Sequence, residues 1–141
     1  MKNVVVTGMG IISCIGSGLN EVLSSLKNGK SGIKPNPIYK EMGFRSHVSG
    51  SIDINLSELI DRKVLRFMSE ASGFAYLATQ EALINAGLDL SSIDTSRIGI
   101  VAGSGGASSA AQIEASDIAR AKGPKRIGPY AVTKTMGSTV S

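Results

Sequence analysis

The sequence predicts an α/β fold, because runs typical of buried strands alternate with stretches of helical periodicity. Residues 3–7 and 98–102 are short apolar runs rich in β-branched residues, and glycines follow each of them. Between the two runs, the apolar positions of residues 61–86 repeat with a period of about 3.6 residues. A strand, a helix, a long helix, a strand and a helix therefore follow one another along the chain.

The first helix is expected over residues 19–26, where leucine and valine recur at helical spacing. Asn28 and Gly29 are typical of a helix end, so the helix should stop there. Residues 29–55 contain two prolines and no sustained period, which predicts mostly loop. Within that stretch, residues 47–50 are expected to form a short strand or a bend.

The long helix over residues 61–86 should end at Gly87, which is suited to a C-terminal cap. Gly73 lies inside this helix and weakens it by about 1 kcal/mol relative to alanine, unless another backbone packs there. A further helix is expected from about residue 110 to 121. Gly128 and Pro129 then open a last helix, since proline is suited to a first helical turn.

The chain is short for the fold that it predicts. Its 141 residues suit one domain or one piece of a larger domain. Two strands do not make a satisfactory sheet, and three Tyr, three Phe and no Trp leave a thin core. We therefore expect the front part of a larger protein, with an exposed apolar patch where helices would lie under strands that this chain lacks.

Composition excludes several classes of protein. No apolar run approaches the roughly 20 residues of a membrane span, and the N-terminus does not resemble a secretory signal. One cysteine excludes an intramolecular disulfide, and one cysteine with one histidine excludes a Cys/His zinc site within one chain. The cytosol is the expected compartment. A net charge of +4 suits an acidic partner but does not by itself indicate nucleic acid.

Two glycine motifs resemble phosphate-binding loops. Residues 8–13 nearly match G-x-G-x-x-G, but Ser13 replaces the third glycine and no second strand ends in an acidic residue at the required distance. A tight turn is favoured there, with a nucleotide site as the alternative. Residues 29–31 resemble the tail of a P-loop, but Ser24 stands where that motif needs its first glycine, so we reject a P-loop.

No catalytic group stands out from the residues alone. Cys14 is the single candidate thiol nucleophile and His47 the single imidazole, but nothing in their spacing joins them. A buried structural role is favoured for Cys14. Residues 103–106, read GSGG, follow an expected strand and suit either an anion-binding nest or a turn against which another chain or ligand presses.

Two basic clusters are candidate binding surfaces. Arg62, Lys63 and Arg66 lie at the start of the expected long helix, where cations oppose the helix dipole and so lower its stability. Such basic groups are usually solvated surface, and composition alone favours that interpretation. The position of this cluster at a helix start is the one detail against it, and a role in binding acidic side chains or phosphate would explain it. The second cluster lies just before the last helix: Lys122, Lys125 and Arg126.

Five segments resemble the condensing enzymes of fatty-acid synthesis, the β-ketoacyl synthases. They are, in order, residues 4–10 (VVVTGMG), 45–48 (RSHV), 60–69 (IDRKVLRFMS), 102–106 (AGSGG) and 128–136 (GPYAVTKTM). The third is specific and favours the type I synthases over type II. The resemblance covers essentially the whole chain and implies part of the N-terminal half of a thiolase-like, layered α-β-α fold, truncated before the turn that carries the family's nucleophile.

The resemblance implies binding residues rather than catalytic ones. The family's acidic acyl carrier protein docks on basic residues, and its acyl chain lies in a pocket near the dimer interface. The matching positions are Arg62, Lys63 and Arg66, with Lys122 and Lys125 as a second set, for the carrier, and Gly105, Gly106 and Met136 for the acyl pocket. Ala107 follows where some relatives differ.

The resemblance also implies a reaction for the longer protein, which is a cytoplasmic homodimer in this interpretation. It is the decarboxylative Claisen condensation of an acyl thioester with malonyl carrier protein, and it needs no metal or dissociable cofactor. No catalytic residue of the family matches a position here, and Cys14 and His47 do not match its nucleophile or its histidines. We therefore expect residues 1–141 alone to be inactive. A non-enzymatic module that binds carrier protein is the alternative.

Overall fold

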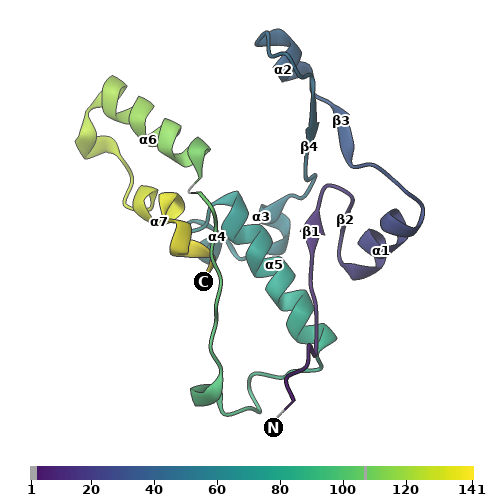
Figure 1. Ribbon diagram of the computed structural model, residues 1–141. Helices are drawn as coiled ribbons and strands as arrows, with labels where there is room; N and C mark the ends of the chain where they lie inside the picture. Colours follow the sequence, from purple (N-terminus) through teal and green to yellow (C-terminus); the bar gives the residue numbers. More distant parts are fainter. Residues whose placement is uncertain (1–2, 107) are drawn as a thin grey trace. The chain divides into compact units, whose positions relative to one another are not determined.

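The computed structural model describes residues 3–106 and 108–141. The chain divides into two units, which are described separately (Figure 1). The first comprises Met1–Ile54 and Ala78–Asp89, and the second comprises Asn55–Leu77 and Leu90–Ser141. The longest helix, α5 (Glu70–Asn85), therefore contributes its N-terminal half to the second unit and its C-terminal half to the first.

Two small hairpins and two helices make up the rest of the first unit. β1 (Ile12–Ser13) pairs antiparallel with β2 (Gly16–Ser17) and leads into α1 (Leu19–Lys27). β3 (Ile33–Pro35) pairs antiparallel with β4 (Val48–Gly50), and α2 (Pro37–Glu41) lies between them. The predicted strand near residue 48 is confirmed, whereas the prediction of loop over the rest of residues 29–55 missed β3 and α2.

Helix α1 forms where the periodicity predicted it. Val22 and Ser25 face inward, and the Ser25 hydroxyl donates to the carbonyl of Ile15 at 2.6 Å. The helix stops because Gly29 adopts a φ of 60°, a conformation that favours glycine. The predicted end at Asn28 and Gly29 is confirmed.

Polar side chains of α5 hold the N-terminal segment of the first unit. The Glu81 carboxylate accepts hydrogen bonds from the backbone N–H of Ile11 at 2.9 Å and of Leu19 at 2.7 Å. Four residues further along the helix, Asn85 Oδ1 accepts from the N–H of Met9 at 3.1 Å. One helix thus satisfies backbone donors that no strand partner satisfies.

Glycines allow this segment to approach the helix backbone. A β-carbon on Gly10 would collide with the carbonyl oxygen of Ala78, and one on Gly8 would collide with that of Ala82. The alanines of α5 therefore pack against bare backbone. Because the helix fills the space beside both glycines, the structure argues against a nucleotide site there. The predicted tight turn over residues 8–13 is also wrong, because the turn lies at Cys14 and Ile15, between β1 and β2.

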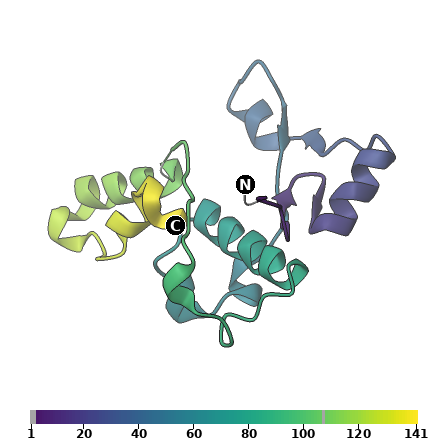
Figure 2. The ribbon, with the colours of Figure 1, turned by 60° about the horizontal axis from the view of Figure 1, so that its bottom comes forward.

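Short helices dominate the second unit. The elements that precede α5 are α3 (Leu56–Leu59) and α4 (Arg62–Leu65). Those that follow it are η1 (Thr95–Arg97), α6 (Ser109–Lys122), η2 (Pro124–Arg126), α7 (Ala131–Thr135) and η3 (Gly137–Val140). Helix α7 lies beside α6 in both ribbon views (Figure 2).

The predicted helix over residues 61–86 is wrong at its N-terminal end. Asp61 caps α4 instead, by accepting from the N–H of Lys63 at 2.6 Å. The hydroxyl of Ser69 then accepts from the N–H of Ser72 at 3.3 Å, immediately before α5 begins. Two caps in nine residues break the apolar period into separate helices. At the other end, Gly87 has a φ of 65°, which confirms the predicted C-terminal cap.

Two further predictions differ from the structure: the neighbour of Gly73 and the length of the last helix. A β-carbon on Gly73 would lie 2.6 Å from Leu56 Cδ1, so a side chain from α3 occupies the space where a backbone was expected. The predicted helix after Pro129 is shorter than expected, because Met136 is extended (φ −80°, ψ 130°) and separates α7 from η3. Helix α6 agrees closely with its prediction.

The two predicted buried strands are not formed among the described residues. Val4 is 96% exposed and Val101 is 104% exposed, and neither run is paired with another strand. A strand needs a neighbour for its backbone hydrogen bonds, and no described segment supplies one. The β-branched composition predicted extended backbone correctly but not its burial.

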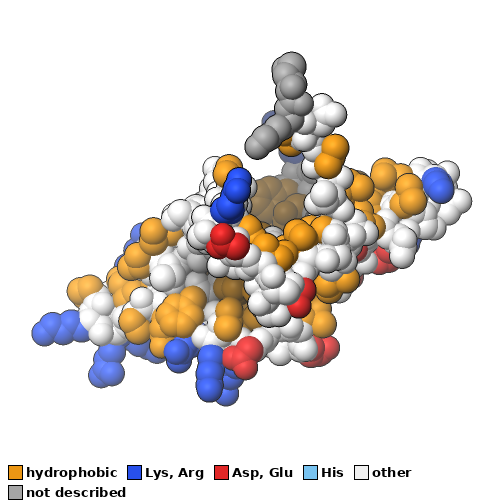
Figure 3. Space-filling view, turned by 90° about the horizontal axis from the view of Figure 1, so that it is seen from below, with side chains coloured by type: hydrophobic (Ala, Val, Ile, Leu, Met, Phe, Trp, Pro, Cys, Tyr) orange, Lys and Arg blue, Asp and Glu red, His pale blue; other side chains and the backbone are white. Residues whose placement is uncertain are grey.

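Few apolar side chains are buried within either unit. Among the described residues, the buried hydrophobic side chains are Val22, Leu56 and Ile60. Many others are exposed, and Figure 3 shows apolar side chains spread across the face in view. The expected exposure of apolar surface is confirmed. None of the helices in the described ranges has both the length and the hydropathy required to cross a membrane.

Candidate functional site

The first basic cluster, Arg62, Lys63 and Arg66, lies on and directly after helix α4. Arg62 and Lys63 form its first turn, and Arg66 is its C-terminal cap. All three side chains are exposed. The helix has only four residues and the Asp61 carboxylate caps its start, so the opposition to a long helix dipole that the sequence suggested does not exist. The binding role then depends on exposure and charge instead.

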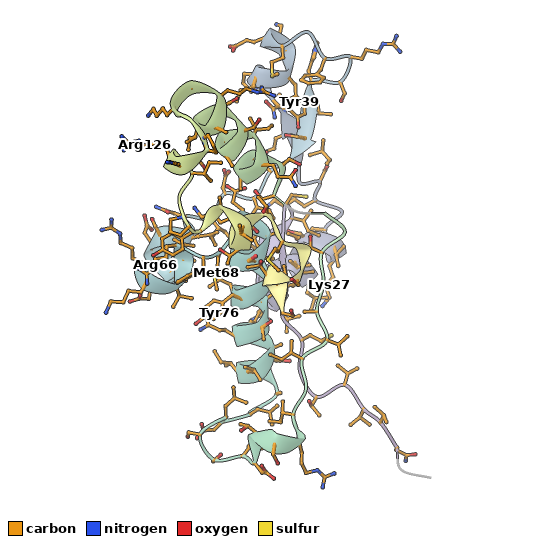
Figure 4. All side chains as sticks on the ribbon, turned by 90° about the vertical axis from the view of Figure 1, so that its left-hand side faces the viewer. Lys27, Tyr39, Arg66, Met68, Tyr76 and Arg126 are labelled. Carbon is orange, nitrogen blue, oxygen red and sulfur yellow. The ribbon has the colours of Figure 1, made fainter. Side chains whose placement is uncertain are left out.

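Arg66 is held against two aromatic rings. Its guanidinium carbon lies 4.9 Å from the centroid of the Phe67 ring and 5.2 Å from that of Tyr130. The two rings meet edge to face, with centroids 4.8 Å apart and planes at 80°. Figure 4 labels Arg66 at the outer flank of α4, where nitrogen-tipped side chains extend outward. Both contacts fall in the range of cation–π interactions.

The cluster borders an open hollow of about 550 Å³. Its lining residues are Asp61, Arg62, Lys63, Arg66 and Tyr130. Three of the five are cations and one is an acid, so the hollow is electropositive. Within the described ranges, none of the three cations forms an ion pair with a carboxylate of this chain. Their charges are therefore available to a partner.

The second cluster follows from the end of α6. Lys122 is the last residue of that helix, and Gly123, with a φ of 84°, turns the chain into η2, which contains Lys125 and Arg126. All three cations are exposed. The chain reaches Tyr130 four residues later, and Tyr130 also lines a smaller hollow of about 140 Å³ between α6 and α7. Tyr130 therefore borders both hollows, the one beside α4 and the one between α6 and α7.

The residues predicted for the acyl pocket are exposed in this chain. Gly105 and Gly106 lie in a bend of the chain and are exposed, and Met136 is 48% exposed. A β-carbon on Gly137 would lie 3.3 Å from the carbonyl oxygen of Ser104, so the glycine segment and the end of α7 are neighbours. Their assignment to an acyl pocket stays a prediction. Ala107 lies outside the described residues.

The glycine segment is not an anion nest. A nest needs a residue with positive φ, and none of Gly103, Gly105 and Gly106 has one. The Ser104 hydroxyl instead donates to the carbonyl of Gly106 at 2.7 Å and closes a local turn. This contact favours the turn over the nest. No described residue other than their chain neighbours lies within 4 Å of the β-carbon positions of Gly103, Gly105 and Gly106, so the expectation that another chain or ligand presses there stays a prediction.

The candidate nucleophile and the candidate base are not brought together. Cys14 is half-buried in the turn between β1 and β2, and its Sγ atom packs against Gly32 and Gly50. His47 is exposed, and no hydrogen bond joins it to Cys14. No group of three or more potential metal ligands occurs in the described part of the chain. These observations agree with a structural role for Cys14.

Phe67 and Tyr130 are the residues of this site that the sequence did not single out. Phe67 was read as one member of an apolar helix face, and Tyr130 as the start of a helix. Their spacing in the sequence does not predict a contact, because Phe67 comes shortly after α4 and Tyr130 directly precedes α7. Only the fold places both rings on Arg66.

Comparison with known proteins defines the class of protein first. A crystal structure of a beta-ketoacyl synthase from Burkholderia phymatum matches with a TM-score of 0.82 at 24% identity, covering 99% of this chain and 35% of that one. A type II polyketide acyl-carrier protein in complex with its ketosynthase, AntDE:AntF, matches with a TM-score of 0.70 at 23% identity, covering 96% and 35%. The fold is that of the thiolase-like ketosynthases, as predicted.

Sequence comparison then defines the family. The profile described as "Beta-ketoacyl synthase, N-terminal domain" matches residues 1–141. The 3-oxoacyl-[acyl-carrier-protein] synthase 1 of Haemophilus influenzae is 53% identical over 142 aligned positions, covering 100% of this chain and 35% of the relative. The chain belongs to the β-ketoacyl synthase family and spans about a third of the length of that relative.

Proposed function

We propose that this chain provides part of the carrier-docking surface of a 3-oxoacyl-acyl-carrier-protein synthase of fatty-acid elongation. The observation that carries the proposal is the exposed, unpaired cluster of Arg62, Lys63 and Arg66 around one electropositive hollow. The family and the 53% identity to a synthase of this kind support the assignment. So does the complex of a related ketosynthase with an acyl-carrier protein.

The reaction of the longer protein is decarboxylative Claisen condensation. An enzyme thiolate takes the acyl group from its carrier thioester, and malonyl carrier protein loses carbon dioxide to give the carbanion that attacks the acyl-enzyme. Both substrates arrive on the same acidic protein. Docking therefore governs both half-reactions, and it is the part of the mechanism to which the described residues contribute. A homodimer and a pocket lined by Gly105, Gly106 and Met136 complete the proposal.

Exposed cations suit this task. Charges at the rim of an interface accelerate encounter and exclude wrong partners, while contributing little to the fold. Lys122 and Lys125 are a second exposed basic set, which we assign to carrier docking from the partner subunit's side of the pocket. The expected partner is therefore an acidic protein rather than nucleic acid or a membrane.

A triple charge reversal tests the docking surface. The variant Arg62→Glu/Lys63→Glu/Arg66→Glu should bind apo acyl carrier protein at least about tenfold more weakly at low salt, because attraction becomes repulsion. The deficit should shrink at about 0.15 M salt, where the Debye length is near 8 Å. Surface plasmon resonance at two salt concentrations measures both effects.

A matched variant controls for net charge. Lys30, Lys40 and Arg97 are exposed and unpaired in the described structure, so reversing them also lowers the net charge by 6, from +4 to −2. This control should bind the carrier protein within about threefold of the unaltered chain, because none of its three residues lines the hollow beside α4. Equal losses in the two variants would show that total charge, not this site, attracts the carrier.

A further inference from the structure

Arg66 differs from its two basic neighbours in how it is held. Its guanidinium lies against the Phe67 and Tyr130 rings, at 4.9 Å and 5.2 Å from their centroids, whereas no ring contact involves Arg62 or Lys63. The three side chains otherwise share the same short segment and the same exposure. A cation held on one side by two rings is restricted, whereas no ring or carboxylate among the described residues holds the other two.

The rings also restrict each other. Phe67 follows Arg66 directly in the sequence, whereas Tyr130 precedes α7 and belongs to the C-terminal segment of the second unit. Their edge-to-face contact at 4.8 Å is a favourable aromatic geometry. Phe67 is 39% exposed and Tyr130 is partly buried, so the pair forms a half-covered platform rather than a loose surface contact.

An aromatic platform orients a cation without neutralising it. A carboxylate partner would hold Arg66 equally well but would compete with an acidic ligand for its N–H donors. Asp61 borders the same hollow, but its carboxylate accepts from the N–H of Lys63 and forms no ion pair with Arg66. The planar guanidinium stacks through its face and keeps its edge donors for a carboxylate or phosphate.

We propose that Phe67 and Tyr130 are positioning residues for Arg66, which they hold ready to receive an acidic group of the docking partner. This inference rests on the proposed function and assigns different tasks within one cluster. Arg62 and Lys63, which no ring holds, attract the partner at a distance and set the association rate. Arg66, being preorganised, makes the short contact that sets the dissociation rate.

The decisive variants change the Tyr130 ring and leave the charge of Arg66 in place. Tyr130→Leu removes the platform, and Tyr130→Phe keeps the ring and removes only the hydroxyl. We expect Tyr130→Leu to raise the dissociation rate of apo acyl carrier protein about three- to tenfold, and Tyr130→Phe to stay within about twofold of the unaltered chain. Stopped-flow or surface plasmon resonance at low salt separates association from dissociation.

A double-mutant cycle shows whether Tyr130 acts through Arg66. In the Arg66→Ala background, Tyr130→Leu should cause little further loss, because the group that it positions is gone. Additive losses would overturn the inference, and so would equal losses from Tyr130→Phe and Tyr130→Leu. Far-UV circular dichroism of each variant identifies general loss of structure, which would weaken binding in both backgrounds.

A measurement without the partner separates the two proposals. In the free chain, the side-chain NMR signals of Arg66 should be shifted by the ring currents, should move in Tyr130→Leu and should stay in Tyr130→Phe. Unshifted signals would overturn the positioning role even if Arg66→Ala weakens binding. If the signals respond as expected but Arg66→Ala binds the carrier normally, the platform exists and the docking proposal is wrong.

Discussion

Individual glycines determine how closely the backbone of the N-terminal segment approaches helix α5. Gly8 and Gly10 lie where any β-carbon would overlap a helix carbonyl oxygen, so the close approach depends on the missing side chain. The alanines on the facing side of α5 complete the fit, since larger residues would push the two backbones apart. The polar contacts of Glu81 and Asn85 are possible only at this separation.

Substitution at Gly10 should therefore be destabilising. Gly10→Ala forces the backbone away from Ala78, and overpacking of this kind lowers the free energy of unfolding by about 1–3 kcal/mol. Urea unfolding followed by circular dichroism measures the change. Gly99→Ala is the matched control, because nothing lies within 4 Å of its β-carbon position and its φ is not positive. Equal stability of the Gly10 and Gly99 variants would contradict the packing argument.

At the scale of elements, the Glu81 carboxylate joins two parts of the first unit. One of its oxygens accepts from Leu19, the first residue of α1, and the other from Ile11, directly before β1. An anion at the start of a helix also interacts favourably with the helix dipole. A single side chain on α5 thus fixes where the first hairpin and the first helix begin.

Removing one acceptor should loosen both elements. In Glu81→Gln, one carboxylate oxygen becomes an amide donor that faces a backbone N–H. The loss of a charge-assisted hydrogen bond should lower the free energy of unfolding by about 1.5–3 kcal/mol. Amide hydrogen exchange should show faster exchange at Ile11 and Leu19. Glu114→Gln, on the exposed side of α6, should change the free energy by less than about 0.5 kcal/mol. Unchanged exchange at both amides would contradict the proposed role of Glu81 in holding the two elements.

Local signals predicted helices better than strands. α1 followed from its period and from Gly29, which ends it, and α6 agrees with the helix that was predicted over residues 110–121. The long helix was predicted wrongly at its start because its apolar period was given more weight than the caps at Asp61 and Ser69, although both residue types are visible in the sequence. The strands failed for a different reason: burial depends on a partner strand, which no local pattern reveals.

The residues of the candidate site were likewise only partly predictable from the sequence. The basic residues were identifiable, because charge and spacing are properties of one segment. The platform under Arg66 was not, because Tyr130 reaches it only through the packing of the second unit. The dipole argument supported the first basic cluster for a reason that the four-residue helix removes. Exposure and the absence of ion pairs are the better reasons.

At the scale of the whole molecule, apolar surface is the main liability of the chain. Val4, Val6, Ile100 and Val101 are each more than two-thirds exposed and lie in extended segments whose backbone is unpaired among the described residues. Apolar strands with free edges are templates for pairing with other chains. Burial of this surface between copies should lower its free energy by about 25 cal/mol per Å².

The isolated chain should therefore self-associate. Sedimentation velocity at rising protein concentration should show species larger than a 14.6 kDa monomer, and a dye that fluoresces on apolar surfaces should bind. The variant Val4→Lys/Val101→Lys should reduce association without lowering the free energy of unfolding, because both side chains are almost fully exposed. Lys substitution at two helix positions that are exposed and polar, Asn20 and Gln112, adds the same charge without removing apolar surface. If that control suppressed association equally, charge repulsion rather than strand pairing would be the cause, and a monomer at every concentration would contradict the prediction itself.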